Sequence, residues 1–600
     1  MGGLRSLTIH FPYGWAAGRR GAKTGFRVFE VTVKLSNQRR SKMKKLLVVL
    51  GVLMVLSVSI FSETVAYLTS QDGQQIYESY FLELDQLMGE YHNTVLNMLS
   101  QNPQYDQYFN KPIDLISITD VLMEYKAMEK FLNDNGITLD ATKITQETDQ
   151  MYNQYLGSES TKQIFLMFFE KEEYIRGFVN SLVYGNEVIS ELRKYFSNFS
   201  EEELSTYVSN NFEDLKDQYD TVKISRVVTS DEITANNIKS EILQNNISFT
   251  EAASENSVDT ETASVGGLVG WVKRGDISKN IFEASLSSTP GEIIGPISSP
   301  LGYQIVRVED KKIYETPDEL LLDNDIRNQL TTSFVDYQIT NWYDPYMSNY
   351  DFVISYEPLA IAYDIYKAQS FDDLANVEKK YRDDILSGNG LPEEWYVSYI
   401  FIVENLLPMK ISQKNDLESY LNIAQSYPEF LEYSNDEINS QIEHYTQFMD
   451  TAESTDLRNE ASQKESALRE LAYLQGTYGL FTGPEIQNKY DELTNDIEQM
   501  NEALENSLVT LREMNPDAIE VIGKLYQTKP DDPNVAFDYY ATLYSYILDY
   551  YNSTGDIESV RQDLETIKGI LNSLNTESLD EESVNQRQQI LENIDQLLNQ

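Results

Sequence analysis

The sequence predicts a mostly helical α+β protein, in which a small α+β domain is inserted in a helical core and followed by an all-helical C-terminal region. Three observations predict this fold class. Residues 63–219 and 357–600 carry apolar and aromatic side chains three and four positions apart, the spacing of amphipathic helices. Between them, residues 221–311 alternate β-rich runs with helical segments and Gly/Pro turns, as compact α+β domains do.

The composition disfavours several classes of metal-binding and hydrolytic sites. A chain of 600 residues holds about three or four domains of ordinary size. It has no cysteine, and its three histidines, His10, His92 and His444, lie far apart. Disulfides, thiolate metal sites and Ser-His-Asp chemistry are therefore disfavoured, and we expect no metal and no cofactor.

Charge is distributed unevenly along the chain. Residues 1–62 hold eleven Lys and Arg and one acid, Glu30, whereas the remainder holds 36 basic and 95 acidic residues, a net charge of −59. An acidic surface of this size repels the phosphate backbone, so no nucleic-acid partner is expected.

Residues 43–62 have the pattern of an export signal. Met43-Lys-Lys precedes an apolar run at 46–61, with small serines near residue 62. The run of about 16 residues is shorter than the ~20 that span a bilayer, which favours cleavage. The alternative is an anchor retained in the cytoplasmic membrane through residues 46–61, and only then would the chain have a membrane partner.

Residues 1–42 precede this signal, although a signal normally begins its own chain. We interpret them as a non-native extension upstream of a true start at Met43, and the alternative is an unusually long n-region. With either start, the chain is expected to be exported to the periplasm or cell envelope, with the mature part beginning near Glu63.

Residues 63–220 are predicted to form a helical N-terminal domain. A short strand at Thr64–Leu68 and a turn at Asp72-Gly73 precede a helix. The stripe that predicts this helix is Ile76, Tyr80, Leu84, Leu87, Tyr91, Val95 and Met98. A second helix at Ile118–Leu132 ends at the left-handed cap Asn135-Gly136, Asp140 caps a third, and Ser200 with Glu203 forms a capping box.

Residues 221–311 are predicted to form the α+β domain. VKISRVV, EIIGPI and YQIVRVED read as strands, with a turn at Pro290-Gly291. Thr229 with Glu232 is expected to cap a helix, and Phe249–Ala253 to form another. Residues 312–356 then supply a helix over Asp318–Asn341 and a last strand in NYDFVISYEP, completing the helical core.

Residues 357–600 are predicted to be a helical C-terminal domain. Its breaks are Gly388-Asn-Gly390, Gly483-Pro484, Asn515-Pro516 and Asp532-Pro533. The apolar spacing around Gly555-Asp556 resembles one tetratricopeptide unit, but no second copy aligns at 34 residues. A tetratricopeptide-like array and an irregular helical bundle both remain open.

Four segments in order resemble the parvulin, or PpiC-type, peptidyl-prolyl isomerase family. They are SRVVTSDEITA at 225–235, FTEAASENSVDTETASVGGLVGWV at 249–272, RGDISKNIFEA at 274–284 and PGEIIGPISSPLGYQIVRVEDK at 290–311. The flanking helices and the final strand resemble the split helical core of exported chaperones of the SurA and PrsA type. Residues 357–600 lie outside both resemblances.

The resemblance implies a site for a proline ring. Phe282 falls on the aromatic wall of the family's proline slot, and Val269 and Ile277 fall on its aliphatic walls. Asp259 falls where the family has Cys or Asp beside the substrate carbonyl, and Ser299 falls on a small hydroxyl position. The alternatives are that the three apolar residues only pack the core and that Asp259 is a loop or cap acid.

The chain departs from the family pattern at the floor of this site. Arg226 and Gln304 stand where the family usually has two histidines, and Leu268 replaces the Asp common in GGDLGW. Arg cannot share a proton at neutral pH as His does, but Arg226 can pair with Asp259 and keep it ionised. Isomerisation is therefore either retained, reduced or lost.

The glycines of GGLVGWVKR do not form a phosphate loop, because neither a Lys-Ser/Thr pair nor GxGxxG follows. Gly266, Gly267 and Gly270 are interpreted as positions that let the chain turn into a strand. Lys273 and Arg274 are interpreted as solvated charges.

Three functions remain open. The first is an exported peptidyl-prolyl isomerase and chaperone whose partners are unfolded or proline-containing polypeptides. The second is a non-catalytic holdase with a degenerate parvulin domain. The third is a helical-repeat scaffold that binds an envelope protein through residues 357–600.

Overall fold

The computed structural model describes residues 63–599, apart from 102–109, 389, 480 and 517. The predicted signal or anchor at 43–62 and the extension at 1–42 lie outside the described residues. Within them the chain is mostly helical with two antiparallel sheets, which confirms the predicted fold class. Two compact units divide the described residues: those within 63–127, 141–183 and 350–599 form one, and those within 128–140 and 184–349 form the other.

The first unit contains a three-stranded sheet of order β2-β1-β7. Its strands are β1 (Thr64–Ser70), β2 (Ile76–Glu83) and β7 (Tyr350–Ile354). Ala66 pairs with Leu82 of β2 and with Ile354 of β7. The central strand β1 therefore pairs both with the strand that follows it and with a strand far away in the sequence.

The prediction of a helix beginning at Ile76 is wrong for residues 76–83, because they form the strand β2. Gly73, at φ +69, closes the turn by donating its N–H to Ser70 O at 2.7 Å. IYESYFLE is rich in aromatic residues that suit a strand, and pairing with β1 supplies its backbone hydrogen bonds. The helix begins only at Leu84.

Five helices follow this hairpin. They are α2 (Leu84–Gln101), α3 (Lys111–Asp134), α4 (Ala141–Leu156), α5 (Glu159–Phe169) and α6 (Glu172–Phe196). Helix α3 begins seven residues before the predicted Ile118 and ends just before Gly136, whose φ of +79 fits the predicted cap. Helices α2 and α6 approach closely at Gly177, where a Cβ would lie 2.1 Å from Asp85 O.

The second unit contains a helical platform beside a sheet. Its helices are α7 (Glu201–Asn210), α8 (Phe212–Tyr219), α13 (Pro317–Leu322) and α14 (Asn324–Met347). The predicted capping box is confirmed, because Ser200 Oγ accepts from Glu203 N and Glu203 accepts from Ser200 N. The single helix predicted over 318–341 is two helices, since Asp323 ends α13 and caps α14 through Asp325 N.

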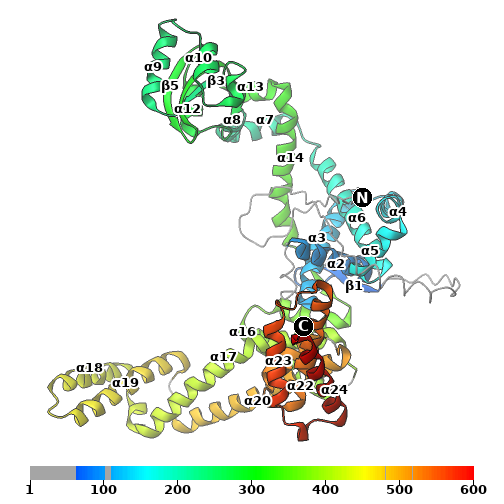
Figure 1. The fold of residues 1–600 in the computed structure, drawn as a ribbon, viewed down its shortest axis with the longest axis vertical. Helices are drawn as coiled ribbons and strands as arrows, with labels where there is room; N and C mark the ends of the chain where they lie inside the picture. The colour runs from blue at the N-terminus through cyan, green and yellow to red at the C-terminus, as the bar shows by residue number, and fades with distance from the viewer. Residues whose placement is uncertain (1–62, 102–109, 389, 480, 517, 600) are drawn as a thin grey trace, which may run out of the picture. The chain divides into compact units, whose positions relative to one another are not determined.

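The predicted α+β domain has a four-stranded sheet of order β4-β3-β6-β5. Its elements are β3 (Thr221–Thr229), α9 (Glu232–Leu243), α10 (Phe249–Asn256), α11 (Thr260–Ala263), β4 (Leu268–Lys273), α12 (Lys279–Ser287), β5 (Ile293–Ser299) and β6 (Gly302–Lys312). Figure 1 shows α9, α10 and α12 around these strands. The predicted cap at Thr229 is wrong: Asp231 caps α9, and Thr229 ends β3.

The two faces of this sheet have different cores. On one face, Val227 and Ile305 pack with Ile238 of α9 and Phe249 of α10. On the other, Val306 packs with Phe282 of α12. The sheet is tied to the platform by Asp220, whose Oδ1 accepts from Tyr314 N at 2.9 Å while its Oδ2 accepts from Lys216.

The chain after β7 is helical, as predicted. The helices are α15 (Ala360–Lys367), α16 (Phe371–Ser387), α17 (Glu393–Ser426), α18 (Asn435–Thr451), α19 (Thr455–Tyr478), α20 (Gly483–Met514), α21 (Ile519–Thr528), α22 (Pro533–Thr554), α23 (Arg561–Ser573) and α24 (Glu581–Leu598), with 3-10 turns η2 (Glu357–Leu359), η3 (Pro428–Glu432) and η4 (Thr576–Ser578). Three hydrophobic clusters hold these helices. The tetratricopeptide-like repeat stays a prediction, and among the described helices none is long and apolar enough to cross a membrane.

Candidate active site

The sequence-predicted polar residues of the site share one face of the four-stranded sheet. Arg226 of β3 pairs with Val306 of β6, and Val228 pairs with Gln304. Residues opposite each other in an antiparallel pair point to the same side, as do alternate residues along a strand. Arg226 and Gln304 therefore lie on the face that carries Val306 and α12.

Arg226 and Asp259 form an ion pair at the edge of this face. Arg226 Nε donates to Asp259 Oδ2 at 2.7 Å, and both side chains are largely buried. The loop that carries Asp259 is fixed to β3, because Val258 N donates to Val228 O at 2.8 Å. The pairing expected from the sequence is thus present, while the catalytic role of both residues stays a prediction.

The protonation of Asp259 follows from its neighbours. Burial alone would raise the pKa of this carboxyl group, but hydrogen bonds from Thr262 and Arg226, with the charge of Arg226, outweigh burial and lower the pKa. Asp259 is therefore a carboxylate at neutral pH. It can orient Arg226, whose side-chain hydrogen bonds among the described residues use only Nε, so the two terminal nitrogens are available as donors.

Gln304 and Ser299 form a second polar pair on this face. Gln304 Nε2 donates to Ser299 Oγ at 2.7 Å, and Ser299 Oγ donates to Gly302 O at 2.9 Å. Gln304 is 3% exposed, so its amide is held in place at the position that the sequence resemblance assigns to a second histidine. The pair offers neutral hydrogen-bonding groups and no group that titrates near pH 7.

The three apolar residues belong to one cluster. Phe282 is buried at 1% exposure, whereas Val269 and Ile277 are half-buried at its edge. The accessible apolar surface is therefore supplied by Val269 and Ile277, with Phe282 beneath. This arrangement fits both interpretations, a proline slot and a packed core, and the slot remains a prediction.

Arg274 is exposed, as the sequence indicated, but it also makes specific contacts. Its guanidinium lies 5.4 Å from the ring centroid of Phe282 and pairs with Asp217 at 3.0 Å and Glu283 at 3.2 Å. It covers the aromatic residue and links β4 to the neighbouring helices. Lys273 is exposed as well.

The glycines shape the way into β4. Gly267 has φ +83, and a Cβ there would lie 2.5 Å from Arg226 O. Only glycine allows this conformation and this approach. Its carbonyl accepts from Arg226 N at 2.8 Å, so the glycine turn positions Arg226 directly.

Two residues of the site were not singled out from the sequence. Thr262 Oγ1 donates to Asp259 Oδ2 at 2.5 Å, and Ser257 Oγ accepts from Val228 N at 3.1 Å. The Asp-x-x-Thr spacing at the start of a helical turn could have indicated Thr262. Nothing local to Ser257 predicts its contact with β3, which lies 29 residues earlier.

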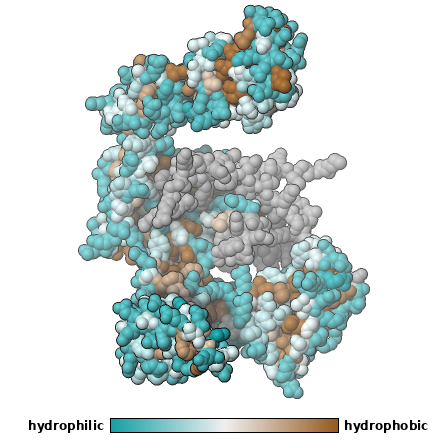
Figure 2. All heavy atoms as spheres, turned by 90° about the vertical axis from the view of Figure 1, so that its left-hand side faces the viewer, coloured by the Kyte–Doolittle hydropathy of each residue, from teal (hydrophilic) through white to brown (hydrophobic). Residues whose placement is uncertain are grey.

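Apolar side chains also reach the surface of this domain. Figure 2 shows hydrophobic patches among hydrophilic residues in the part at the top of the view. Exposed apolar residues here include Val258, Val265, Leu268, Trp271 and Leu301. Leu268, which stands where the sequence resemblance expects Asp, thus adds exposed apolar surface to β4.

The four-stranded antiparallel sheet with α12 over one face lies in the part of the chain that matches a protein family. Residues 226–310 match the family model described as Rotamase, the PPIC-type PPIASE domain. The chain therefore contains a PpiC-type peptidyl-prolyl isomerase domain, as the sequence resemblance predicted.

Relatives of the chain include proteins named foldases. It is 34% identical over 103 residues to Foldase protein PrsA of Geobacillus kaustophilus, covering 16% of this chain and 36% of that protein. It is 26% identical over 262 residues to Foldase protein PrsA of Halalkalibacterium halodurans, covering 44% of this chain and 70% of that protein. The first match thus spans about a third of its relative.

Solved structures similar to the chain include a peptidylprolyl isomerase and a parvuline. The crystal structure of the peptidylprolyl isomerase PrsA from Bacillus anthracis is 22% identical, covering 37% of this chain and 97% of that one at a TM-score of 0.21. The solution structure of NmPin, the parvuline of Nitrosopumilus maritimus, is 26% identical, covering 15% and 97% at a TM-score of 0.14.

Proposed function

We propose that this chain is an exported peptidyl-prolyl cis-trans isomerase and chaperone that assists the folding of secreted or envelope proteins. The observation that carries the proposal is one sheet face where half-buried Val269 and Ile277 lie in one cluster with Phe282, and where Arg226 is oriented by Asp259. The match of residues 226–310 to the PPIC-type family and the similarity to PrsA foldases support it.

Prolyl isomerisation requires no nucleophile, metal or cofactor from the protein. The barrier to rotation about an X-Pro bond is about 18–20 kcal/mol, and the isomers differ by only ~1 kcal/mol. Catalysis then needs an apolar place for the ring and groups that bind the twisted amide better than the planar one. In this proposal Val269 and Ile277 contact the proline ring, and Phe282 supports them from below.

The polar residues would act on the amide itself. A twisted amide loses resonance, so its carbonyl carbon and oxygen behave more like a ketone and its nitrogen becomes more basic. The free Arg226 nitrogens are suited to donate to the amide nitrogen, whose lone pair accepts a hydrogen bond only in the twisted form, while ionised Asp259 fixes the guanidinium. Gln304 and Ser299 supply a fixed hydrogen-bonded floor without proton transfer.

A protease-coupled assay on a proline peptide tests the proposal with the full chain. Turnover above the buffer rate, lowered by Asp259→Ala and by Ile277→Arg, is expected. Glu255→Gln on the exposed surface of α10 serves as the control. Turnover equal to buffer, or unchanged by both site substitutions, would contradict an isomerase.

A second candidate, a holdase with a degenerate isomerase domain, is favoured by one specific observation: Arg226 and Gln304 occupy both family histidine positions. In that case the full chain would suppress aggregation of an unfolded client while prolyl turnover stays at the buffer rate. Ile277→Arg would then reduce client protection only if the slot binds clients.

The location and domain organisation also belong to the proposal. Residues 43–62 would direct export, with anchoring through 46–61 if the segment is retained.

The proposed domains are 63–220, 221–311, 312–356 and 357–600, and the last of them would offer a surface for an envelope partner. Fractionation of cells and the mass of the mature N-terminus test export, and a full-length cytosolic product would contradict it.

A further inference from the structure

Helices α7 and α14 form a pocket of about 370 Å³ that the candidate active site does not use. It lies within the unit of residues 128–140 and 184–349. The lining residues are Ser200, Glu202, Glu203, Thr206, Tyr207, Asn210, Asn211, Phe334 and Tyr337. This volume is at the small end of ligand pockets, so it suits a single long side chain.

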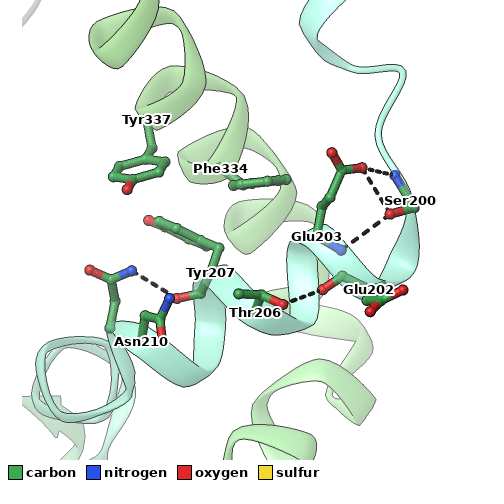
Figure 3. Close-up of a pocket in the computed structure, with 9 residues that line it drawn as sticks. Ser200, Glu202, Glu203, Thr206, Tyr207, Asn210, Phe334 and Tyr337 are labelled. Carbon is green, nitrogen blue, oxygen red and sulfur yellow. Dashed lines mark hydrogen bonds between the residues drawn. The ribbon is translucent and has the colours of Figure 1, made fainter.

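One wall of the pocket is aromatic. The ring of Tyr207 lies 5.0 Å from the rings of both Phe334 and Tyr337, measured between centroids. Figure 3 shows Tyr207 extending from α7 toward the two rings of α14. Phe334 is buried in the core of the platform, while Tyr337 is 47% exposed. The wall is therefore fixed from beneath and open to solvent.

The charge of the lining is negative. It contains two carboxylates, Glu202 and Glu203, and none of the nine lining residues is Lys or Arg. Hydrogen bonds from the Ser200 backbone and hydroxyl lower the pKa of Glu203, which is therefore ionised at neutral pH. The nearby Arg327 is already paired, since it donates to both carboxylate oxygens of Glu201 at 2.7 and 2.6 Å.

We propose that this pocket binds the cationic side chain of Arg or Lys in a client polypeptide. Aromatic faces attract cations, and a guanidinium can stack on a ring while it pairs with a carboxylate. The net charge of −49 adds long-range attraction for basic segments. The identity of the client rests on the proposed chaperone function, because it takes the ligand to be an unfolded polypeptide.

The site gives the helical platform a binding preference different from that of the sheet. The proline slot is apolar, whereas the pocket between α7 and α14 combines rings with carboxylates. A client that carries basic residues would therefore be held at a second point. Two weak sites on one chain raise the effective affinity without any additional contact at either site.

Fluorescence anisotropy with the full chain tests the proposal. The probe is a labelled, unstructured, proline-free peptide with a single Arg, and its partner peptide carries citrulline, which is neutral and similar in shape. We expect the Arg peptide to bind about tenfold more tightly at low salt. The advantage should shrink as salt screens the carboxylates.

Three variants locate the binding. Tyr337→Ala removes the exposed ring and should weaken Arg-peptide binding about three- to tenfold. Glu202→Gln keeps the shape of an exposed side chain and should weaken binding about threefold. Gln329→Ala, also on α14 but outside the pocket lining, should bind as the unmodified chain does.

Equal binding of the Arg and citrulline peptides would overturn the proposal, as would unchanged affinity in both Tyr337→Ala and Glu202→Gln. Because the probe has no proline, the outcome is independent of the isomerase slot. Prolyl turnover measured on the same preparations separates the two: lost turnover with intact Arg-peptide binding contradicts the proposed isomerase alone, and the reverse contradicts this pocket alone.

Discussion

At the scale of single residues, the candidate site is built around an ion pair where the family has a histidine. Arg226 Nε lies 2.7 Å from Asp259 Oδ2, and both side chains are largely shielded from water. The pair keeps a fixed charge across neutral pH, which a histidine cannot do. The pH dependence of activity is therefore a direct readout of which chemistry this site uses.

We predict that prolyl turnover is constant from pH 8 to about 5 and falls only when Asp259 is protonated, below the ordinary carboxyl pKa of about 4. The direction follows from the lowered pKa of Asp259: its ionised form, and the stability that depends on it, is present above that range and lost as the pH falls. The pH–rate profile of kcat/KM checks this.

The variant Asp259→Asn should lower kcat/KM about 10- to 100-fold, because Arg226 loses the charge that orients it. Glu255→Gln should change neither the rate nor the profile. An acid limb between pH 6 and 7 in the unmodified chain would show that another group titrates in the reaction.

His92 is a second residue whose environment decides its protonation. Its ring stacks on Tyr174 at 5.8 Å and lies 5.9 Å from Phe169, measured between ring centroids. Its Nε2 is buried and has no hydrogen-bond partner among the described residues. Burial lowers its pKa. The unfolded chain, with an imidazole pKa of about 6.5, therefore takes up the proton first as the pH falls.

We predict that His92→Gln loses less stability on acidification than the unmodified chain does. As the pH falls from 8 to 5.5, the unfolding free energy of the variant should therefore rise relative to that of the unmodified chain, because glutamine does not titrate. Urea unfolding at both pH values measures it. Equal losses of stability on acidification in the unmodified chain and in His92→Gln would contradict the argument.

At the scale of elements, the turn into β4 joins strand geometry to the site. The carbonyl of Gly267 accepts from Arg226 N, and its missing Cβ leaves room for Arg226 O. A change at this glycine should therefore alter both the sheet and the ion pair. Elsewhere in the domain, Gly275 has a similar φ of +99 but open space around it.

We predict that Gly267→Ala destabilises the chain more than Gly275→Ala does. Both substitutions carry the cost of a positive φ, about 1–3 kcal/mol. Gly267→Ala adds overpacking against Arg226 O, about 1–3 kcal/mol more. Chemical denaturation measures the difference, and equal losses of stability would show that the close approach is relieved at little cost.

At the scale of the whole molecule, buried charges hold distant helices in one register. Arg382 of α16 donates to Glu378 at 2.8 Å, to Asp496 of α20 at 2.6 Å and to Gln499 at 2.8 Å. Tyr399 of α17 also donates to Glu378, which is fully buried. Three helices therefore share one ionic network.

We predict that Arg382→Met lowers the unfolding free energy by about 3–5 kcal/mol, because it leaves Glu378 buried and unpaired. The matched control is Lys464→Met, which breaks an exposed pair with Glu460 at the same four-residue spacing. That change should cost less than about 1 kcal/mol. Chemical denaturation checks both, and similar costs would contradict a structural role for the network.

Much of the fold follows from local sequence signals. The capping box at Ser200, the helix end at Gly136 and the strand at 221–229 depend on residues a few positions apart, so the sequence predicts them. The error at residues 76–83 has a physical cause. Their aromatic spacing fits a helix or a strand, and the choice depends on the hairpin with β1.

The sequence by itself determined the mostly helical α+β fold class, the order of most helices and strands, the acidic charge and the residue types at the candidate site. Only the tertiary structure decided that Thr262 contacts Asp259, that Arg274 covers Phe282 and that Tyr207 meets Tyr337 across α7 and α14. The reason is distance along the chain. Helix caps and periodicity depend on residues a few positions apart. A pocket depends on the packing of segments that are distant in the sequence, and the local sequence does not predict their contacts.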